Sequence, residues 1–156
     1  MAFVLLSDDI EPNDTIPIEH TCDGDDRSPP LTWKGAPAET AAYALVVHDP
    51  DAPRGDWVHW VVFDLPATTR SLPTGVPRAR TVDGGAQGTN DFGKIGWGGP
   101  CPPPGAAHRY VFELYALDAP LGLPPGSTRA EVERAMEGHV LARTELVGRY
   151  ARPTEG

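Results

Sequence analysis

The sequence predicts a mainly β sandwich, on three observations. Short apolar runs of strand length recur along the 156 residues, turns rich in Gly (17) and Pro (18) separate them, and a helical pattern appears only after residue 127. Many short strands joined by such turns are typical of sandwiches and barrels. Because no repeat, linker or shift in composition divides the chain, we expect one domain over residues 1–156.

Three stretches have the strongest strand pattern: Ala42–His48, Trp57–Leu65 and His108–Asp118. In each, apolar residues alternate or follow one another over the length of a strand. The first two are apolar on both faces, which is typical of central strands in a covered sheet. We therefore expect these stretches to lie at the centre of the fold.

The remaining strand patterns are shorter. Phe3–Leu6 and Leu31–Trp33 are predicted as brief strands. Thr15–Thr21 alternates weakly and is predicted as an edge strand, because Pro17 cannot donate to a ladder of hydrogen bonds. Ala142–Ala151 is interpreted as a closing strand rather than as a continuation of the helix before it.

One helix is predicted late in the chain. Thr128 and Glu131 have the spacing of a capping box, in which each side chain accepts a hydrogen bond from the other's backbone. The helix is expected to run to about Glu137, with Gly138 as its stop.

The charge balance excludes some classes of function. Acidic residues outnumber basic ones by 22 to 13, so the formal net charge is −9. A nucleic-acid binder or a protein on an anionic membrane would present a basic face, so the negative net charge argues against both classes.

The N-terminal apolar run is too short for a signal peptide and no segment has the length of a membrane span, so we expect a cytoplasmic protein that is not integral to a membrane. In that compartment Cys22 and Cys101 are expected to be free thiols.

Polar residues gather where the predicted strands begin and end. Asp49 and Asp51 follow the first strong strand, each with a proline within two residues, and His59 lies near the start of the next. Because successive side chains of a strand alternate between faces, His48 points away from Asp49 and is excluded from the site. Polar groups on rigid turns at strand ends are how a β scaffold forms a pocket.

A second pair, His108 and Tyr110, opens the third strong strand. At i and i+2 these side chains lie about 7 Å apart on one face. Alone, such a pair more often belongs to a core, but with His59 and the carboxylates it predicts a pocket. Histidine, a tyrosine hydroxyl and loop N–H groups suit a phosphate-like anion. Carboxylates would repel it unless they keep the histidines protonated or meet a cationic group, as in phosphoethanolamine.

Other chemistries could use the same kinds of residue. Two His and two Asp could hold zinc, but no HExxH or similar spacing occurs, so we expect no metal and no cofactor. The acidic residues 23–26 do not have the spacing of an EF-hand and are interpreted as a solvated loop. No G-x-S-x-G nucleophile is present. A hydrolase using Asp49, His59 and His108 as acid–base groups remains an alternative.

Four motifs resemble the phosphatidylethanolamine-binding protein (PEBP) family, also called Raf-kinase-inhibitor-like. They are Asp49-Pro50-Asp51-Ala52-Pro53, His59-Trp60, Gly99-Pro100-Cys101-Pro102-Pro103 and His108-Arg109-Tyr110. Around Cys22 and after Glu137 the sequence resembles the bacterial YbhB/YbcL-type branch. The resemblance covers nearly the whole chain.

The resemblance implies a sandwich of a large and a small sheet, with one or two short helices and an anion pocket at one end. In the family this pocket takes phosphate, acetate, cacodylate or phosphoethanolamine-type groups. Matched motif by motif, its ligand-binding residues are Asp49, Asp51, Pro53, His59, Gly99, Pro100, His108 and Tyr110.

The resemblance also implies a modulator of partner proteins, since family members inhibit kinases or serine proteases or act as signalling scaffolds. We expect a non-enzymatic binding protein. The alternative is an inhibitor of a serine protease or kinase that acts through residues 96–105. We do not extend kinase inhibition from these family members to this chain, because the hairpin after Pro53 is short and the chain ends soon after Tyr150.

Two questions stay open from the sequence. One is whether the protein forms a homodimer. The other is whether Cys22 and Cys101 form a disulfide, since the motifs that contain them would border the pocket.

Overall fold

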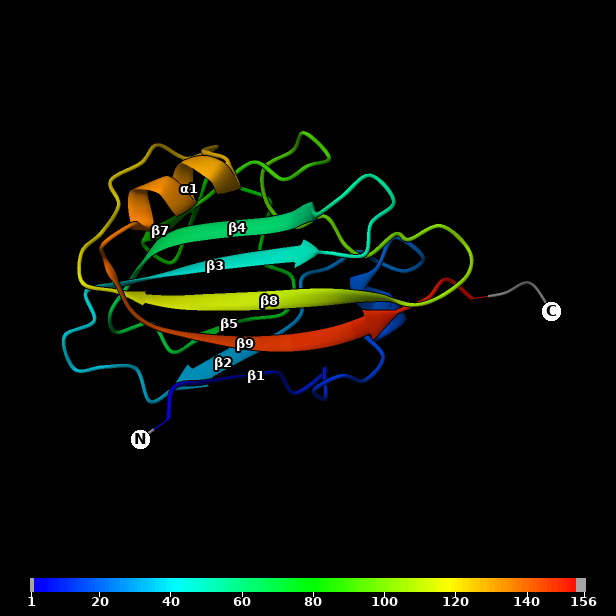
Figure 1. Cartoon of the computed structure of the whole chain (residues 1–156), viewed down its shortest axis with the longest axis horizontal. Helices are drawn as coiled ribbons and strands as arrows, with labels where there is room; N and C mark the ends of the chain where they lie inside the picture. The colour runs from blue at the N-terminus through cyan, green and yellow to red at the C-terminus, as the bar shows by residue number, and fades with distance from the viewer. Residues whose placement is uncertain (1, 154–156) are drawn as a thin grey trace.

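Two antiparallel sheets and one α-helix make up the computed structural model of this chain, which describes residues 2–153 (Figure 1). The mainly β sandwich predicted from the sequence is therefore confirmed. The strands are β1 (Val4–Leu6), β2 (Leu31–Lys34), β3 (Ala42–Asp49), β4 (Trp57–Pro66), β5 (Ser71–Leu72), β6 (Thr81–Val82), β7 (Gly85–Gln87), β8 (His108–Leu117) and β9 (Val140–Tyr150); the helix is α1 (Arg129–Met136).

The two sheets differ in size. The large sheet has the strand order β6-β7-β4-β3-β8-β9, and the small sheet has the order β1-β2-β5. In Figure 1 the long strands β4, β3, β8 and β9 run side by side, with β1, β2 and β5 beyond them. No helix among residues 2–153 is long and apolar enough to cross a membrane.

The main core lies between the sheets. Trp33 of β2 packs edge-on against Tyr43 of β3, with their ring centroids 5.6 Å apart. Phe112 and Leu114 of β8 belong to the same buried cluster, as expected from the alternation that puts His108 and Tyr110 on their face. Burying this cluster provides most of the hydrophobic stabilisation that holds the sheets together.

A second apolar cluster covers the other face of the large sheet. Val132 and Met136 of α1 are buried there with Phe63 of β4. The predicted capping box is present, since Thr128 and Glu131 exchange hydrogen bonds between side chain and backbone. Gly138, with φ +82°, follows the helix in a conformation that favours glycine.

The predicted strand Thr15–Thr21 is wrong. Residues Ile18–His20 form a 3₁₀ helix (η1), and only Thr15 makes an isolated bridge, to Arg149. Pro17 has no N–H group and supports the turn rather than a ladder. The other short predicted strands and the closing strand are confirmed as β1, β2 and β9.

The predicted alternation fails in β4 because the strand contains two irregularities. His48 pairs with Val58 and Val47 with Trp60, so His59 is an extra residue in a β-bulge. As a result Trp60 enters the core between the sheets, and strict alternation, which would put His59 and Val61 on one face, does not hold. A second extra residue, Asp64, has φ +57°.

His48 lies on the outer face of the large sheet, away from Asp49, as the sequence predicts. Its Nδ1 is 2.6 Å from Asp56 Oδ1, and its Nε2 is 3.1 Å from Glu113 Oε1. Burial lowers the pKa of His48, but the hydrogen bonds to Glu113 and Asp56 together outweigh burial, so its pKa is raised above 6.5.

This raised pKa makes stability depend on pH. Because the folded protein binds the His48 proton more tightly than the unfolded chain does, the contribution is fully present below an unfolded pKa of about 6.5 and is lost as pH rises through the folded pKa. Urea unfolding should be measured at a series of pH values that spans the folded pKa of His48. As pH rises, wild type should lose a part of its unfolding free energy that His48→Gln does not have to lose. The control variant His139→Gln, at an exposed position, should behave as wild type. Parallel pH curves for wild type and His48→Gln would contradict this assignment.

Candidate functional site

The antiparallel order of β4, β3 and β8 brings one end of β3 next to the starts of both neighbours. Asp49 ends β3, Trp57 starts β4 and His108 starts β8. This is the end toward which the β3 arrow points in Figure 1. The polar residues that the sequence placed at three strand ends therefore meet at one end of the large sheet.

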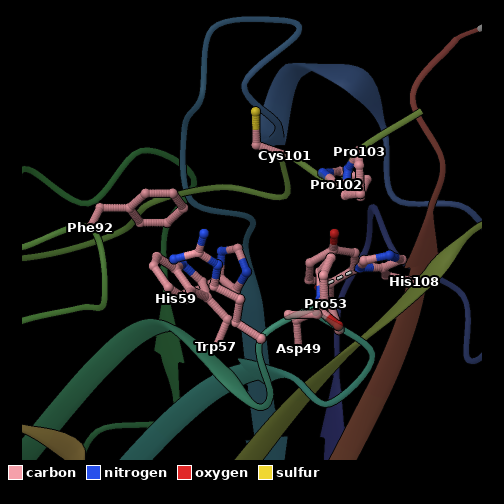
Figure 2. A pocket seen from close by; sticks show the side chains of 12 residues that line it. Asp49, Pro53, Trp57, His59, Phe92, Cys101, Pro102, Pro103 and His108 are labelled. Carbon is pink, nitrogen blue, oxygen red and sulfur yellow. Dashed lines mark hydrogen bonds and ion pairs between the residues drawn. The ribbon is translucent and has the colours of Figure 1, made fainter.

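A cavity of about 290 Å³ opens at this end. Its aspartate, histidines and tyrosine come from the three strands, Arg54 comes from the turn after β3, and its apolar walls come mainly from the turns that follow β3 and precede β8 (Figure 2). The cavity is lined by Asp49, Ala52, Pro53, Arg54, Trp57, His59, Phe92, Cys101, Pro102, Pro103, His108 and Tyr110.

Asp49 and His108 form a hydrogen-bonded pair at the base of the cavity. Asp49 is 3% exposed, and its Oδ2 accepts a hydrogen bond of 2.7 Å from His108 Nδ1, drawn as a dashed line in Figure 2. Asp49 Oδ1 accepts the backbone N–H of Asp51 at 2.8 Å. Both carboxylate oxygens are thus engaged, while Nε2 of His108 has no protein partner within the described residues.

His59 is fixed in one orientation by the backbone. Its Nδ1 lies 2.6 Å from the carbonyl oxygen of Gly98, and because a carbonyl can only accept, Nδ1 carries the proton. Its ring packs edge-on against Tyr110 and Phe92. Burial lowers the pKa of His59, so at pH 7 the ring is neutral and Nε2 is a hydrogen-bond acceptor.

Tyr110 contributes an unpaired hydroxyl. The residue is 1% exposed, and its hydroxyl makes no hydrogen bond of normal geometry to any residue in the 2–153 range, although the Asp49 carboxylate lies near enough to interact with it. Burial, and after it the nearby charge of Asp49, raises the pKa of Tyr110 well above its usual value. The hydroxyl is therefore a permanent donor, and a buried donor without a partner costs free energy unless a ligand or water satisfies it.

Five of the eight predicted ligand-binding residues line the cavity: Asp49, Pro53, His59, His108 and Tyr110. Asp51, which was expected among them, does not line the cavity. It points to the surface, where Arg109 donates to it from its side chain at 2.9 and 3.0 Å and from its backbone. The Arg109 side chain, followed by its backbone N–H, lowers the pKa of Asp51 to about 2.

Gly99 and Pro100 also do not line the cavity. The Gly99 N–H donates to Asp26 Oδ1 at 2.8 Å, and the Pro100 carbonyl accepts from the Cys22 N–H at 3.1 Å. A Cβ on Gly99 would lie 2.2 Å from Asp26 Oδ1, so glycine is needed for this close approach. These two residues fasten the loop before β8 to residues 22–26 instead of forming the pocket wall.

The cavity also contains residues that sequence reasoning did not assign to it. Trp57 could have been found, because it precedes His59 by two residues at the start of the same strand. Phe92, 43% exposed at the rim, gave no usable signal, because its position depends on the fold of a long loop. Figure 2 shows Phe92 beside His59 and Trp57, opposite His108.

The expectation of two free thiols is wrong. Cys22 and Cys101 form a disulfide that joins residues 79 apart in the chain, with Cα atoms 5.4 Å apart. The expectation depended on a reducing compartment, whereas the fold brings the two side chains into contact. Cys101 lines the cavity, so the bond borders the candidate site.

The chain is thus a β-sandwich of a six-stranded and a three-stranded sheet, with a small His-, Tyr- and Asp-lined cavity at one sheet end. A family model described as phosphatidylethanolamine-binding protein matches residues 6–151. The chain therefore belongs to the phosphatidylethanolamine-binding protein family, and the resemblance inferred from its motifs is confirmed.

Individual relatives agree with this assignment. A UPF0098 protein of Methanothermobacter thermautotrophicus is 51% identical over 88% of this chain and 91% of its own length. The UPF0098 protein YbhB of Escherichia coli is 38% identical over 94% of this chain and 99% of its own length.

Two crystal structures have the same fold. Escherichia coli YbcL, described as a member of the mammalian PEBP family, has a TM-score of 0.91 and 34% identity, with 98% of this chain and 100% of YbcL covered. The PEBP homologue CT736 of Chlamydia trachomatis has a TM-score of 0.90 and 37% identity, with 97% of this chain and 99% of CT736 covered.

Proposed function

We propose that the protein binds a small phosphate- or carboxylate-bearing ligand in the cavity at the end of the large sheet, without chemical turnover. The observation that carries the proposal is the buried hydroxyl of Tyr110, which has no hydrogen bond of normal geometry within residues 2–153 and lies in the same cavity as His59 and His108. A buried donor without a well-formed hydrogen bond indicates an acceptor oxygen from a ligand.

The protonation states favour a particular form of ligand. The Tyr110 hydroxyl would donate to a phosphate oxygen and Nε2 of His108 is open to the ligand, whereas neutral His59 needs a donor. A phosphomonoester monoanion supplies both, since it has acceptor oxygens and one P–OH group. An organic substituent, such as an ethanolamine group, would lie against the rings of Trp57 and Phe92, where an ammonium group gains cation–π attraction.

A non-enzymatic role agrees with the state of the carboxylates. In the hydrolase alternative, Asp49 would act as a base with His59 and His108. Both oxygens of Asp49 already accept hydrogen bonds, from His108 and from the Asp51 backbone, and Asp51 is paired with Arg109. The cavity therefore offers no free carboxylate base, and a hydrolase would have to use the neutral ring of His59 as its base.

Modulation of a partner protein is a further part of the proposal. An inhibitor that acts through residues 96–105 would have to present that segment to a protease or kinase. Gly98, Gly99 and Pro100 are each hydrogen-bonded to the body of the protein, so only the part after Cys101 is free to be presented. We favour modulation that follows from ligand binding over direct inhibition by this loop.

Titration calorimetry with phosphoethanolamine, inorganic phosphate and ethanolamine tests the proposal. We expect phosphoethanolamine and phosphate to bind and ethanolamine alone not to bind. Tyr110→Phe should weaken phosphoethanolamine binding about tenfold, because one hydrogen bond to a charged group is lost. Tyr115→Phe is the matched control, since Tyr115 lies on the other face of β8 and bonds Glu113. Equal affinity of wild type and Tyr110→Phe would contradict the proposed role of the hydroxyl.

A further inference from the structure

The cavity wall above Asp49 is formed by a segment with few attachments. Cys101, Pro102 and Pro103 make this wall, seen at the top of Figure 2 opposite Asp49. Residues 102–107 make no hydrogen bond with any other part of residues 2–153. Three of the six are prolines, which have no N–H to donate, and Pro103 to Ala107 are exposed.

Apart from the buried side chain of Pro102, the segment is therefore held only at its two ends. At the far end, His108 enters β8 and pairs with Tyr150 of β9. At the near end, the last attachments are the hydrogen bond from the Cys22 N–H to the Pro100 carbonyl and the Cys22–Cys101 disulfide. The disulfide is the only covalent attachment of this wall to residues 22–26.

The disulfide is accessible to solvent. Cys101 is exposed and Cys22 is half-buried. Both also line a second cavity of about 500 Å³ on the other side of the wall. A reductant can therefore reach the sulfur of Cys101 without entering the ligand cavity.

We propose that the Cys22–Cys101 disulfide is a redox latch on the ligand cavity, so that its reduction releases the wall and weakens ligand binding. A dithiol reductant supplies two electrons and two protons: the S–S bond breaks, two cysteine thiols form, and the dithiol becomes a disulfide. The consequence for affinity rests on the proposed ligand function; the release of the wall does not.

Loss of the latch lowers affinity because the wall must then be ordered on binding. In the oxidised protein the disulfide already restricts the wall before the ligand arrives, so its conformational entropy is not lost on binding. Ordering a released six-residue segment is expected to weaken phosphoethanolamine binding about tenfold.

The experiment compares oxidised protein, protein reduced with dithiothreitol, and the double variant Cys22→Ser/Cys101→Ser. Backbone NMR order parameters of Gly105, Ala106 and Ala107 should fall below about 0.6 after reduction, while those of β3 stay near about 0.85. Calorimetry should show about tenfold weaker phosphoethanolamine binding by the reduced protein. The double variant should match the reduced protein in both measurements and should not respond to dithiothreitol.

The outcomes separate the latch from the ligand function. Unchanged order parameters at residues 105–107 after reduction would overturn the latch, and so would an equal loss of order in β3, which would indicate general unfolding. If the order parameters fall only at residues 105–107 but neither form binds phosphoethanolamine or phosphate, the latch stands and the proposed ligand function fails. If reduction releases the wall but the oxidised and reduced proteins bind phosphoethanolamine equally well, the disulfide does not control binding.

Discussion

A His108→Gln variant is expected to bind phosphoethanolamine about 100-fold more weakly than wild type, which makes it the most damaging single change for binding. His108 is the one histidine of the cavity that is paired with a carboxylate, through Nδ1 to Asp49, and its Nε2 is left for the ligand. Glutamine removes the imidazole nitrogen that faces the ligand. It also takes away the Nδ1–H donor of the Asp49 carboxylate, whose side chain is 5% exposed, beside an incoming anion.

The same substitution should also lower stability, because a buried carboxylate loses its partner. Such a loss costs about 3 kcal/mol in unfolding free energy. The double variant Asp49→Asn/His108→Gln removes the buried charge as well and should recover much of that stability. It should not recover binding, since the imidazole at position 108 is still absent.

Urea unfolding and calorimetry on both variants separate the two roles of His108. Recovery of stability without recovery of affinity is the expected result. If the double variant binds phosphoethanolamine as well as wild type does, the imidazole of His108 is not what holds the ligand. If His108→Gln alone retains wild-type affinity, the cavity does not use this residue.

Local sequence patterns were sufficient to predict much of the fold. The capping box at Thr128 and Glu131 predicted where α1 begins, because both partners lie within one helical turn. Alternation predicted that Tyr110 and Phe112 share the core face of β8, since that strand keeps a period of two. Alternation failed in β4, because nothing in the residue types at His59 or Asp64 marks them as extra residues in the ladder.

The candidate site was predictable where strand ends define it and unpredictable where loops do. Asp49, His59 and His108 end or begin strands, so the order of the sheet brings them together. The direction of Asp51 depends on Arg109, 58 residues later, and no local pattern reveals that competing ion pair. Phe92 reaches the rim through a loop whose path only the folded structure fixes.

The disulfide is the other interaction that the sequence could suggest but not establish, and its removal should have the largest effect on stability. Cys22→Ser/Cys101→Ser is expected to lower the free energy of unfolding by about 4 kcal/mol, as the chain-entropy model gives for a closed loop of this size. The two cysteines are 79 residues apart, so the cross-link removes many conformations from the unfolded chain.

Urea unfolding measures this effect, with wild type in oxidising buffer as the reference. Wild type in dithiothreitol should show the same loss as the double variant, and the double variant should not change on addition of dithiothreitol. A loss much smaller than 4 kcal/mol with both controls satisfied would mean that the unfolded chain keeps Cys22 and Cys101 close without the bond. Because β1 to β9 form their ladders without the cross-link, the variant should still unfold in one cooperative transition.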